Sequence, residues 1–163
     1  MATETVVHRF DRIDKRILAA LQKNADLTNQ QLAEQVGLSP SPCLRRVRAL
    51  EEAGVIINRV TLLDRRKLGL SLTVIILISM DRHTPERFEE FVNQISKLDE
   101  IQECYLITGQ EADYMLKVAI VDMDAYQDFL LNRITRIPGV AGVHSSFVLQ
   151  RVLDRTSLPL GHL

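Results

Sequence analysis

The sequence predicts an α+β protein with an N-terminal helix-turn-helix (winged-helix-like) domain and a C-terminal domain of order β-α-β-β-α-β. Three observations lead to this prediction. Apolar residues recur at helical spacing in three short segments of the first 54 residues, whereas the second half alternates β-rich runs with two amphipathic segments. Charge is also unevenly divided. Residues 1–67 hold 12 Lys/Arg and 8 Asp/Glu, whereas residues 68–163 hold 8 Lys/Arg and 13 Asp/Glu. We expect domains at 1–54 and 70–163, joined by a linker strand at 55–69.

The first two predicted helices carry recognisable start and stop signals. Asp11 is suited to cap a helix whose apolar positions recur through Leu21. Thr28 and Gln31 have the spacing of a capping box, in which each side chain binds a free backbone amide of the other. Gly37 is suited to end this second helix because glycine accepts a positive φ angle.

A third helix is predicted over residues 40–53, directly after this turn. Ser39 is a good N-cap, Pro40 suits the first helical position, and Gly54 ends the helix. Its predicted inward stripe is Cys43, Leu44, Val47 and Leu50. Its predicted outward residues are Ser41, Arg45, Arg46 and Arg48. The β-rich run at 55–62 that follows is predicted to be a strand or wing leading out of the domain.

Two short helices with arginines on the outside of the second are typical of a helix that enters the major groove of DNA. The small polar N-terminal end of helix 40–53 suits close approach to phosphates and base edges. The expected DNA-binding residues are Thr28, Asn29, Gln30, Ser39, Ser41, Arg45, Arg46 and Arg48. The alternative is a solvated helix face, since Glu51 and Glu52 lie close enough in sequence to use part of the arginine charge.

The second half has the element order of a ferredoxin-like domain. Its strands are predicted at 70–80, 101–108, 114–121 and 140–153, and its helices begin after Thr84 and Asp122. This order predicts a four-stranded antiparallel sheet with both helices on one face.

The first of these strands is apolar in both alternating registers over 74–78, so both of its faces favour burial. The two helices cover only one face, and the chain's own termini are too polar and short to cover the other. A second copy, packed sheet against sheet, is the simplest cover. Two recognition helices related by a two-fold axis would read half-sites roughly 34 Å apart, or a multiple of this spacing.

Composition limits the other possibilities. The net charge is −1, but the basic N-terminal part and acidic C-terminal part fit a DNA-binding domain joined to a domain that avoids DNA. No signal peptide is recognised, and the longest apolar stretch, Leu68–Met80, is too short to span a bilayer. Cys43 and Cys104 lack metal-ligand spacing. We expect a cytoplasmic protein with no metal and no cofactor.

Taken together, the motifs resemble the leucine-responsive/asparagine-responsive (Lrp/AsnC, feast/famine) family of bacterial transcriptional regulators over nearly the whole chain. The residues that carry the resemblance are 11–14, 32–33, 36–39, 42–43, 46–47, 50–51 and 54–56, then 108–109, 113–118 and 137–140. The resemblance implies a DNA-binding regulator with a C-terminal domain that binds amino acids. It also implies dimers that assemble further, often into octamers, with effector sites between C-terminal domains. The ending at 156–160 resembles a subgroup that includes cysteine-responsive regulators.

The loop between the second and third strands of the sheet is the expected effector site. A free amino acid needs amides for its carboxylate and an acceptor for its ammonium group. Gly109 lets the chain turn and present amides, and Glu111 or Asp113 is a suitable acceptor. The expected effector-binding residues are Thr108, Gly109, Gln110, Glu111, Ala112, Asp113, Tyr114, Ser145 and Ser146, the two serines by fold-level placement alone.

Two other functions remain open at this point. A catalytic or small-molecule-binding ferredoxin-like protein would need an arrangement of nucleophile and base, whereas His83, His144 and His162 are scattered. RNA binding by the sheet would need strand aromatics and a basic face, but only Tyr105 and Tyr114 precede Phe147 and this half is acidic. Comparing duplex DNA with single-stranded RNA in a filter assay separates these functions. We expect a regulator and not an enzyme.

Overall fold

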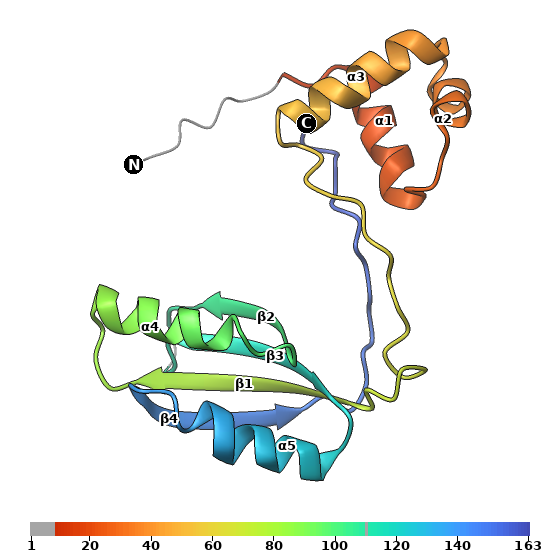
Figure 1. The fold of residues 1–163 in the computed structure, drawn as a ribbon. Coiled ribbons are helices and arrows are strands. Elements are labelled where there is room, and N and C mark those ends of the chain that lie inside the picture. Colours follow the sequence, from red (N-terminus) through yellow and green to blue (C-terminus); the bar gives the residue numbers. More distant parts are fainter. Residues whose placement is uncertain (1–8, 110) are drawn as a thin grey trace. The chain divides into compact units, whose positions relative to one another are not determined.

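Three short helices pack around a core of their own in the computed structural model, which describes residues 9–109 and 111–163 (Figure 1). They are α1 (Arg12–Lys23), α2 (Asn29–Val36) and α3 (Pro40–Glu52). Their buried side chains are Ile17, Leu18, Leu32, Ala33, Val36, Cys43, Val47 and Leu50. The helix-turn-helix predicted from the sequence is therefore confirmed.

The predicted caps form local contacts at the helix ends. Asp11 accepts hydrogen bonds from the amides of Ile13 and Asp14, and Asp14 accepts one from the Asp11 amide, which completes a capping box. Thr28 and Gln31 form the same reciprocal arrangement. Gly37 has φ 72°, in the left-handed region that favours glycine, so it turns the chain from α2 towards α3.

A four-stranded antiparallel sheet forms the second unit. Its elements are β1 (Leu72–Met80), α4 (Pro85–Ile95), β2 (Ile101–Leu106), β3 (Tyr114–Ile120), α5 (Met123–Phe129) and β4 (Val140–Phe147). The strand order is β2-β3-β1-β4, and α4 and α5 lie on the same face of the sheet (Figure 1). The predicted β-α-β-β-α-β order is confirmed. A π-helical turn, Leu130–Ile134, continues α5 and brings Ile134 into the core.

The two faces of β1 differ in burial. Val74, Ile76 and Ile78 are fully buried under the helices. Ile75 and Leu77 point to the opposite face, where no helix of the described chain packs, and are only partly buried. The apolar pattern on both sides of this strand therefore leaves an open apolar sheet face in the single chain.

Two segments that the sequence predicts as strands do not pair with a neighbouring strand. The run at 55–62 contains no strand, and the last strand ends at Phe147 instead of continuing to Leu153. The physical reason is the lack of a partner: β4 pairs only with β1, and the amide of Val148 bonds to Thr73 beside the start of β1. Residues beyond that point have no strand beside them to pair with.

The C-terminal tail lies with the N-terminal helices, outside the domain to which the sequence assigned it. The chain divides into one unit of residues up to Thr61 with Leu153–Leu163, and another of Leu62–Val152. The Gln22 side chain donates to the Leu158 carbonyl at 3.2 Å and accepts from the Leu158 amide at 2.6 Å. Leu160 packs against the N-terminal core. A side chain that satisfies both backbone groups of one residue holds an otherwise exposed tail in place.

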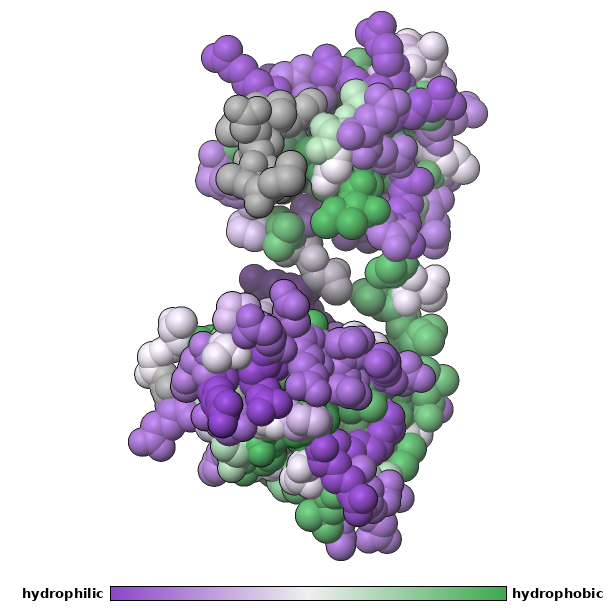
Figure 2. Space-filling view, turned by 60° about the vertical axis from the view of Figure 1, so that its left-hand side comes forward, coloured by the Kyte–Doolittle hydropathy of each residue, from purple (hydrophilic) through white to green (hydrophobic). Residues whose placement is uncertain are grey.

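The visible side of each unit is largely hydrophilic (Figure 2). Many of the exposed large apolar side chains belong to the two connecting segments, 57–63 and 149–153. None of the described helices is long and apolar enough to cross a membrane.

Candidate DNA-binding face and effector loop

The outward face of α3 combines a hydroxyl with two exposed arginines. Ser41, Arg45 and Arg48 recur at intervals of four and three residues, so they lie along one side of the helix. All three are exposed, and with Leu44, Ala49 and Glu52 they line a shallow depression of about 350 Å³. The opposite side is anchored in the core by Cys43, Val47 and Leu50. The fold thus presents a partly cationic helix face that is open to a partner.

Leu44 departs from the sequence prediction, which placed it in the inward stripe. Its side chain is 39% exposed, whereas Cys43 and Leu50 are almost fully buried. The small core between the three helices is filled by Cys43, Val47 and Leu50, and Leu44 lies one helical step (about 100°) from Cys43. It therefore falls on the border of the exposed face.

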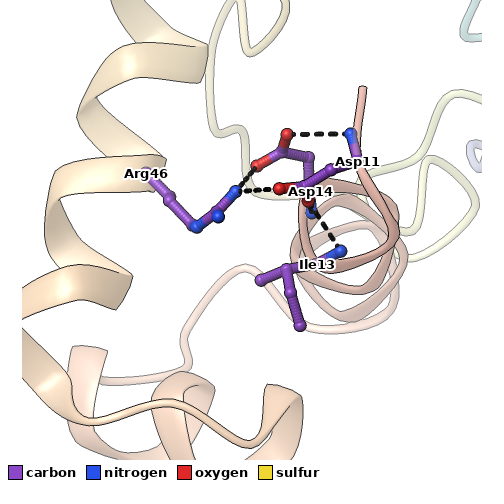
Figure 3. A network of polar contacts seen from close by, with 4 residues as sticks. All are labelled: Asp11, Ile13, Asp14 and Arg46. Carbon is purple, nitrogen blue, oxygen red and sulfur yellow. Dashed lines mark hydrogen bonds and ion pairs between the residues drawn. The ribbon is translucent and has the colours of Figure 1, made fainter. Parts of the chain in front are cut away.

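Arg46 also departs from the prediction of an outward, DNA-contacting side chain (Figure 3). Its Nη1 donates to Asp11 Oδ2 at 2.7 Å and to Asp14 Oδ1 at 2.8 Å. Asp14 is buried, with 7% of its surface exposed, and needs a cationic partner. Arg46 therefore joins α3 to the start of α1 and is already occupied by two carboxylates.

The Asp11 carboxyl responds to this network. The amide of Asp14, and then the Arg46 guanidinium, lower its pKa below the ordinary value of 3.8. Because the folded pKa is depressed, folding favours the carboxylate. The resulting stabilisation is present above pH 3.8 and is lost as the pH falls through the lower folded pKa.

We therefore expect the stability of the α1–α3 unit to fall as the pH is lowered from about 4 towards 2, in part through Asp11. Asp11→Asn keeps a good N-cap but removes the titrating charge, so it should reduce this pH dependence. Urea unfolding followed by helical circular dichroism across this range measures the effect. Equal pH dependence in both proteins would contradict a role for Asp11.

Other predicted DNA-binding residues have local structural contacts. Thr28 caps α2, and the Asn29 side chain donates to the Pro40 carbonyl at 2.8 Å, which joins the starts of α2 and α3. Ser39 occupies the N-cap position of α3, but its side chain makes no capping bond. Gln30 and Ser39 are exposed. Of the eight predicted residues, Ser41, Arg45 and Arg48 are brought together on one exposed face.

Asp113, the predicted ammonium acceptor, is occupied within the fold. Its Oδ2 accepts from the Met80 amide and its Oδ1 contacts His83 Nε2, each at 2.7 Å. Its backbone amide bonds to Ile78 and its carbonyl accepts from Ile107. Asp113 therefore fixes the loop against the end of β1, while Thr108, Gly109 and Glu111 remain exposed.

The remaining predicted effector residues are not gathered at this loop. Ala112 and Tyr114 are buried, and Tyr114 packs on the Phe91 ring at 4.6 Å between centroids. Ser145 and Ser146 face opposite sides of β4, and Ser145 bonds to the hydroxyl of Tyr126. Gln110 lies outside the described residues. Strand alternation puts two successive serines on different faces, so Ser145 and Ser146 do not line one site within the single chain.

An open groove of about 450 Å³ lies between α4 and β2. Its lining is mainly apolar and includes Val92, Ile101, Leu106 and Cys104. Burial raises the pKa of both thiols, Cys43 and Cys104, which disfavours the reactive thiolate. Among the described residues, no three His, Cys, Asp or Glu side chains are grouped to hold a metal ion.

Sequence reasoning missed the Arg46 network and the exposure of Leu44. A signal for the first was present, because Asp11 and Asp14 place two carboxylates in the first turn of α1. A signal for the second was the 43, 47, 50 spacing, which closes a narrow inward stripe without Leu44.

Comparisons with known proteins agree with both halves of the chain. Residues 10–57 match the family model described as winged helix-turn-helix DNA-binding, and residues 73–158 match the Lrp/AsnC ligand binding domain. The leucine-responsive regulatory protein of Escherichia coli K12 is 44% identical over 149 residues, covering 91% of this chain and 90% of the relative. The transcriptional regulator AzlB of Bacillus subtilis is 37% identical over 154 residues, covering 94% and 98%.

Solved structures show the same similarity. A Neisseria meningitidis transcriptional regulator, solved as its L-Met complex, has a TM-score of 0.90 and 40% identity, covering 94% of this chain and 99% of that one. The structure of Escherichia coli AsnC has a TM-score of 0.85 and 30% identity, covering 93% and 100%.

Proposed function

Because the chain belongs to the Lrp/AsnC family of DNA-binding transcriptional regulators, we propose that it reads duplex DNA through the exposed face of α3 and responds to a free amino acid. One observation carries the first part: Ser41, Arg45 and Arg48 share an exposed face of a helix whose other side is fixed in the core. Arginine at such a face contacts phosphates or the O6 and N7 atoms of guanine. Arg46 holds α3 against the start of α1 through its ion pairs with Asp11 and Asp14.

We assign DNA binding and effector binding to separate parts of the chain. Residues 10–54, with the C-terminal tail at 153–163, form the DNA-binding part, and residues 70–152 form the part that binds the effector. The chain acts by binding and not by catalysis, since its relatives are transcriptional regulators. A regulator of this kind works beside the chromosome, in the cytoplasm.

A second copy of the chain covers the open sheet face. Ile75, Leu77 and Met115 lie on this face and are only partly buried in the single chain. Lys117 in the middle of the face is paired with Glu103 on β2, which lowers the pKa of Glu103 and leaves the pair without net charge. The apolar side chains at the centre of this face, beside a lysine that Glu103 neutralises, suit packing against an identical face. The resulting dimer, or a larger assembly of dimers, places two α3 helices on one duplex.

The effector part of the proposal is a free amino acid bound at the exposed part of the 108–113 loop. The L-Met complex of the Neisseria relative supports this class of ligand. Gly109, at φ 88°, turns the chain and offers amides to a carboxylate. Since Asp113 is occupied by Met80 and His83, Glu111 is the loop carboxylate that remains exposed for an ammonium group.

A thermal-shift screen of the twenty amino acids, with methionine first, tests this effector site. A ligand that binds only the folded protein, present at a free concentration of about 100 times its Kd, adds about 2.7 kcal/mol of stability. We therefore expect a clear rise in melting temperature. Glu111→Gln should reduce the rise, whereas Glu89→Ala, at an exposed glutamate on α4, should leave it unchanged. The absence of any shift in the wild-type protein would contradict amino-acid sensing. A full shift in Glu111→Gln would contradict the loop assignment alone.

A further inference from the structure

Leu44 is the one exposed large apolar side chain on the described helices α1, α2 and α3. It lies among polar and charged neighbours at helical spacing, with Ser41 three residues before it, Arg45 directly after it and Arg48 four residues after it. These side chains line the same shallow depression on α3. An isolated exposed leucine elsewhere on a surface needs no explanation, but this one lies within the face that meets DNA.

Leu44 contributes less to the core than its apolar neighbours on α3. The core cluster of the unit is closed by Cys43, Val47 and Leu50 from α3, and Leu44 is outside it. A side chain that is 39% exposed in the free protein still has apolar surface to bury against a partner. The chemistry of the partner then decides what this surface recognises.

Base edges in the major groove present mostly hydrogen-bond donors and acceptors, with one apolar group, the 5-methyl of thymine. Leucine has no donor or acceptor, so covering a polar base edge with it leaves that edge without its water partners and costs free energy. Contact with a methyl group carries no such cost. Leu44 also lies in the N-terminal half of α3, the part of a helix-turn-helix recognition helix that reaches base edges.

We propose that Leu44 recognises the methyl group of a thymine in the major groove and so specifies that base in each half-site. This inference rests on the proposed function, in which the exposed face of α3 enters the groove. Arg45 and Arg48 hold the helix on the duplex by their charge, and Leu44, at the border of the same face, reads a base beside them. Leu44 is therefore a specificity-determining residue of the DNA-binding face.

The test begins with duplexes selected from random sequence by the full-length protein. Each thymine of the selected site is then replaced by deoxyuridine, which removes the methyl group and leaves the hydrogen-bonding edge intact. Burying one methyl-sized group contributes about 0.8 kcal/mol, so we expect about fourfold weaker binding per half-site at one thymine position. Leu44→Ala should bind the thymine and deoxyuridine duplexes equally at that position, while Leu44→Met should retain part of the difference. Leu131→Ala, at an exposed leucine of the C-terminal unit, should behave as wild type.

Different failures of this experiment point to different conclusions. If no thymine position is sensitive, or if Leu44→Ala keeps the same sensitivity as wild type, the role of Leu44 is overturned. If the protein selects no duplex sequence at all, DNA reading by α3 itself fails. Circular dichroism shows whether each variant is folded, and Leu44→Met provides a second folded variant of nearly the same volume.

Discussion

Replacing Arg46 with alanine is expected to destabilise the α1–α3 unit by about 2 kcal/mol, although the residue lies on the recognition helix. The change leaves the buried Asp14 carboxylate without its cationic partner and removes a link between α1 and α3. The value is below that of a fully buried ion pair because 34% of the Arg46 side chain is exposed to solvent. Amide hydrogen exchange of α1 and α3 in the full-length protein measures it, with protection falling roughly 30-fold.

Arg45→Ala is the matched control for this result. Arg45 neighbours Arg46 in sequence but is exposed, so its removal should leave protection unchanged. A cycle with Asp14→Ala adds a second check, because the combined loss should be smaller than the sum of the two single losses. If Arg46→Ala retained wild-type protection, the ion-pair network would not stabilise the unit.

Replacing Arg45 or Arg48 with alanine is expected to have the opposite pattern: weaker duplex binding with unchanged stability. Both side chains are exposed on the face of α3 that meets DNA. Loss of one phosphate contact should weaken binding to all sequences by about tenfold and lower the slope of log K against log salt by about 0.9. Loss of a base contact should cost about 1–3 kcal/mol at one position of the site and relax its specificity there.

Titrations of full-length variants at several salt concentrations distinguish these outcomes. Lys97→Ala, at an exposed lysine after α4, should leave affinity and slope close to wild type. Sedimentation shows whether each variant keeps its assembly state. Wild-type affinity and slope in both Arg45→Ala and Arg48→Ala would contradict the assignment of this face.

Much of the fold follows from local patterns in the sequence. Capping boxes at Asp11 and Thr28, the positive φ at Gly37 and the apolar run of β1 depend on residues a few positions apart. Local hydrogen bonds and periodicity act over such short distances, so the order of helices and strands was predictable. The ends of the strands were not predictable, because the end of β4 depends on where its antiparallel partner β1 begins.

The candidate sites were less predictable because their contacts join distant segments. Asp113 was a reasonable ammonium acceptor until the fold placed the Met80 amide and His83 on its two oxygens. Gln22 likewise holds Leu158, which is 136 residues further along the chain. No local rule relates such residues, since their proximity arises from the packing of whole elements.

The sequence by itself determined a helix-turn-helix followed by a sheet with an apolar open face, and it placed three arginines on one helix. Only the tertiary structure divided those arginines into one that binds Asp11 and Asp14 and two that face outward. It also moved Leu44 from the expected core to the exposed face. The physical reason is that helical periodicity sets directions around an axis, whereas burial depends on which distant side chains arrive to fill the space beside it.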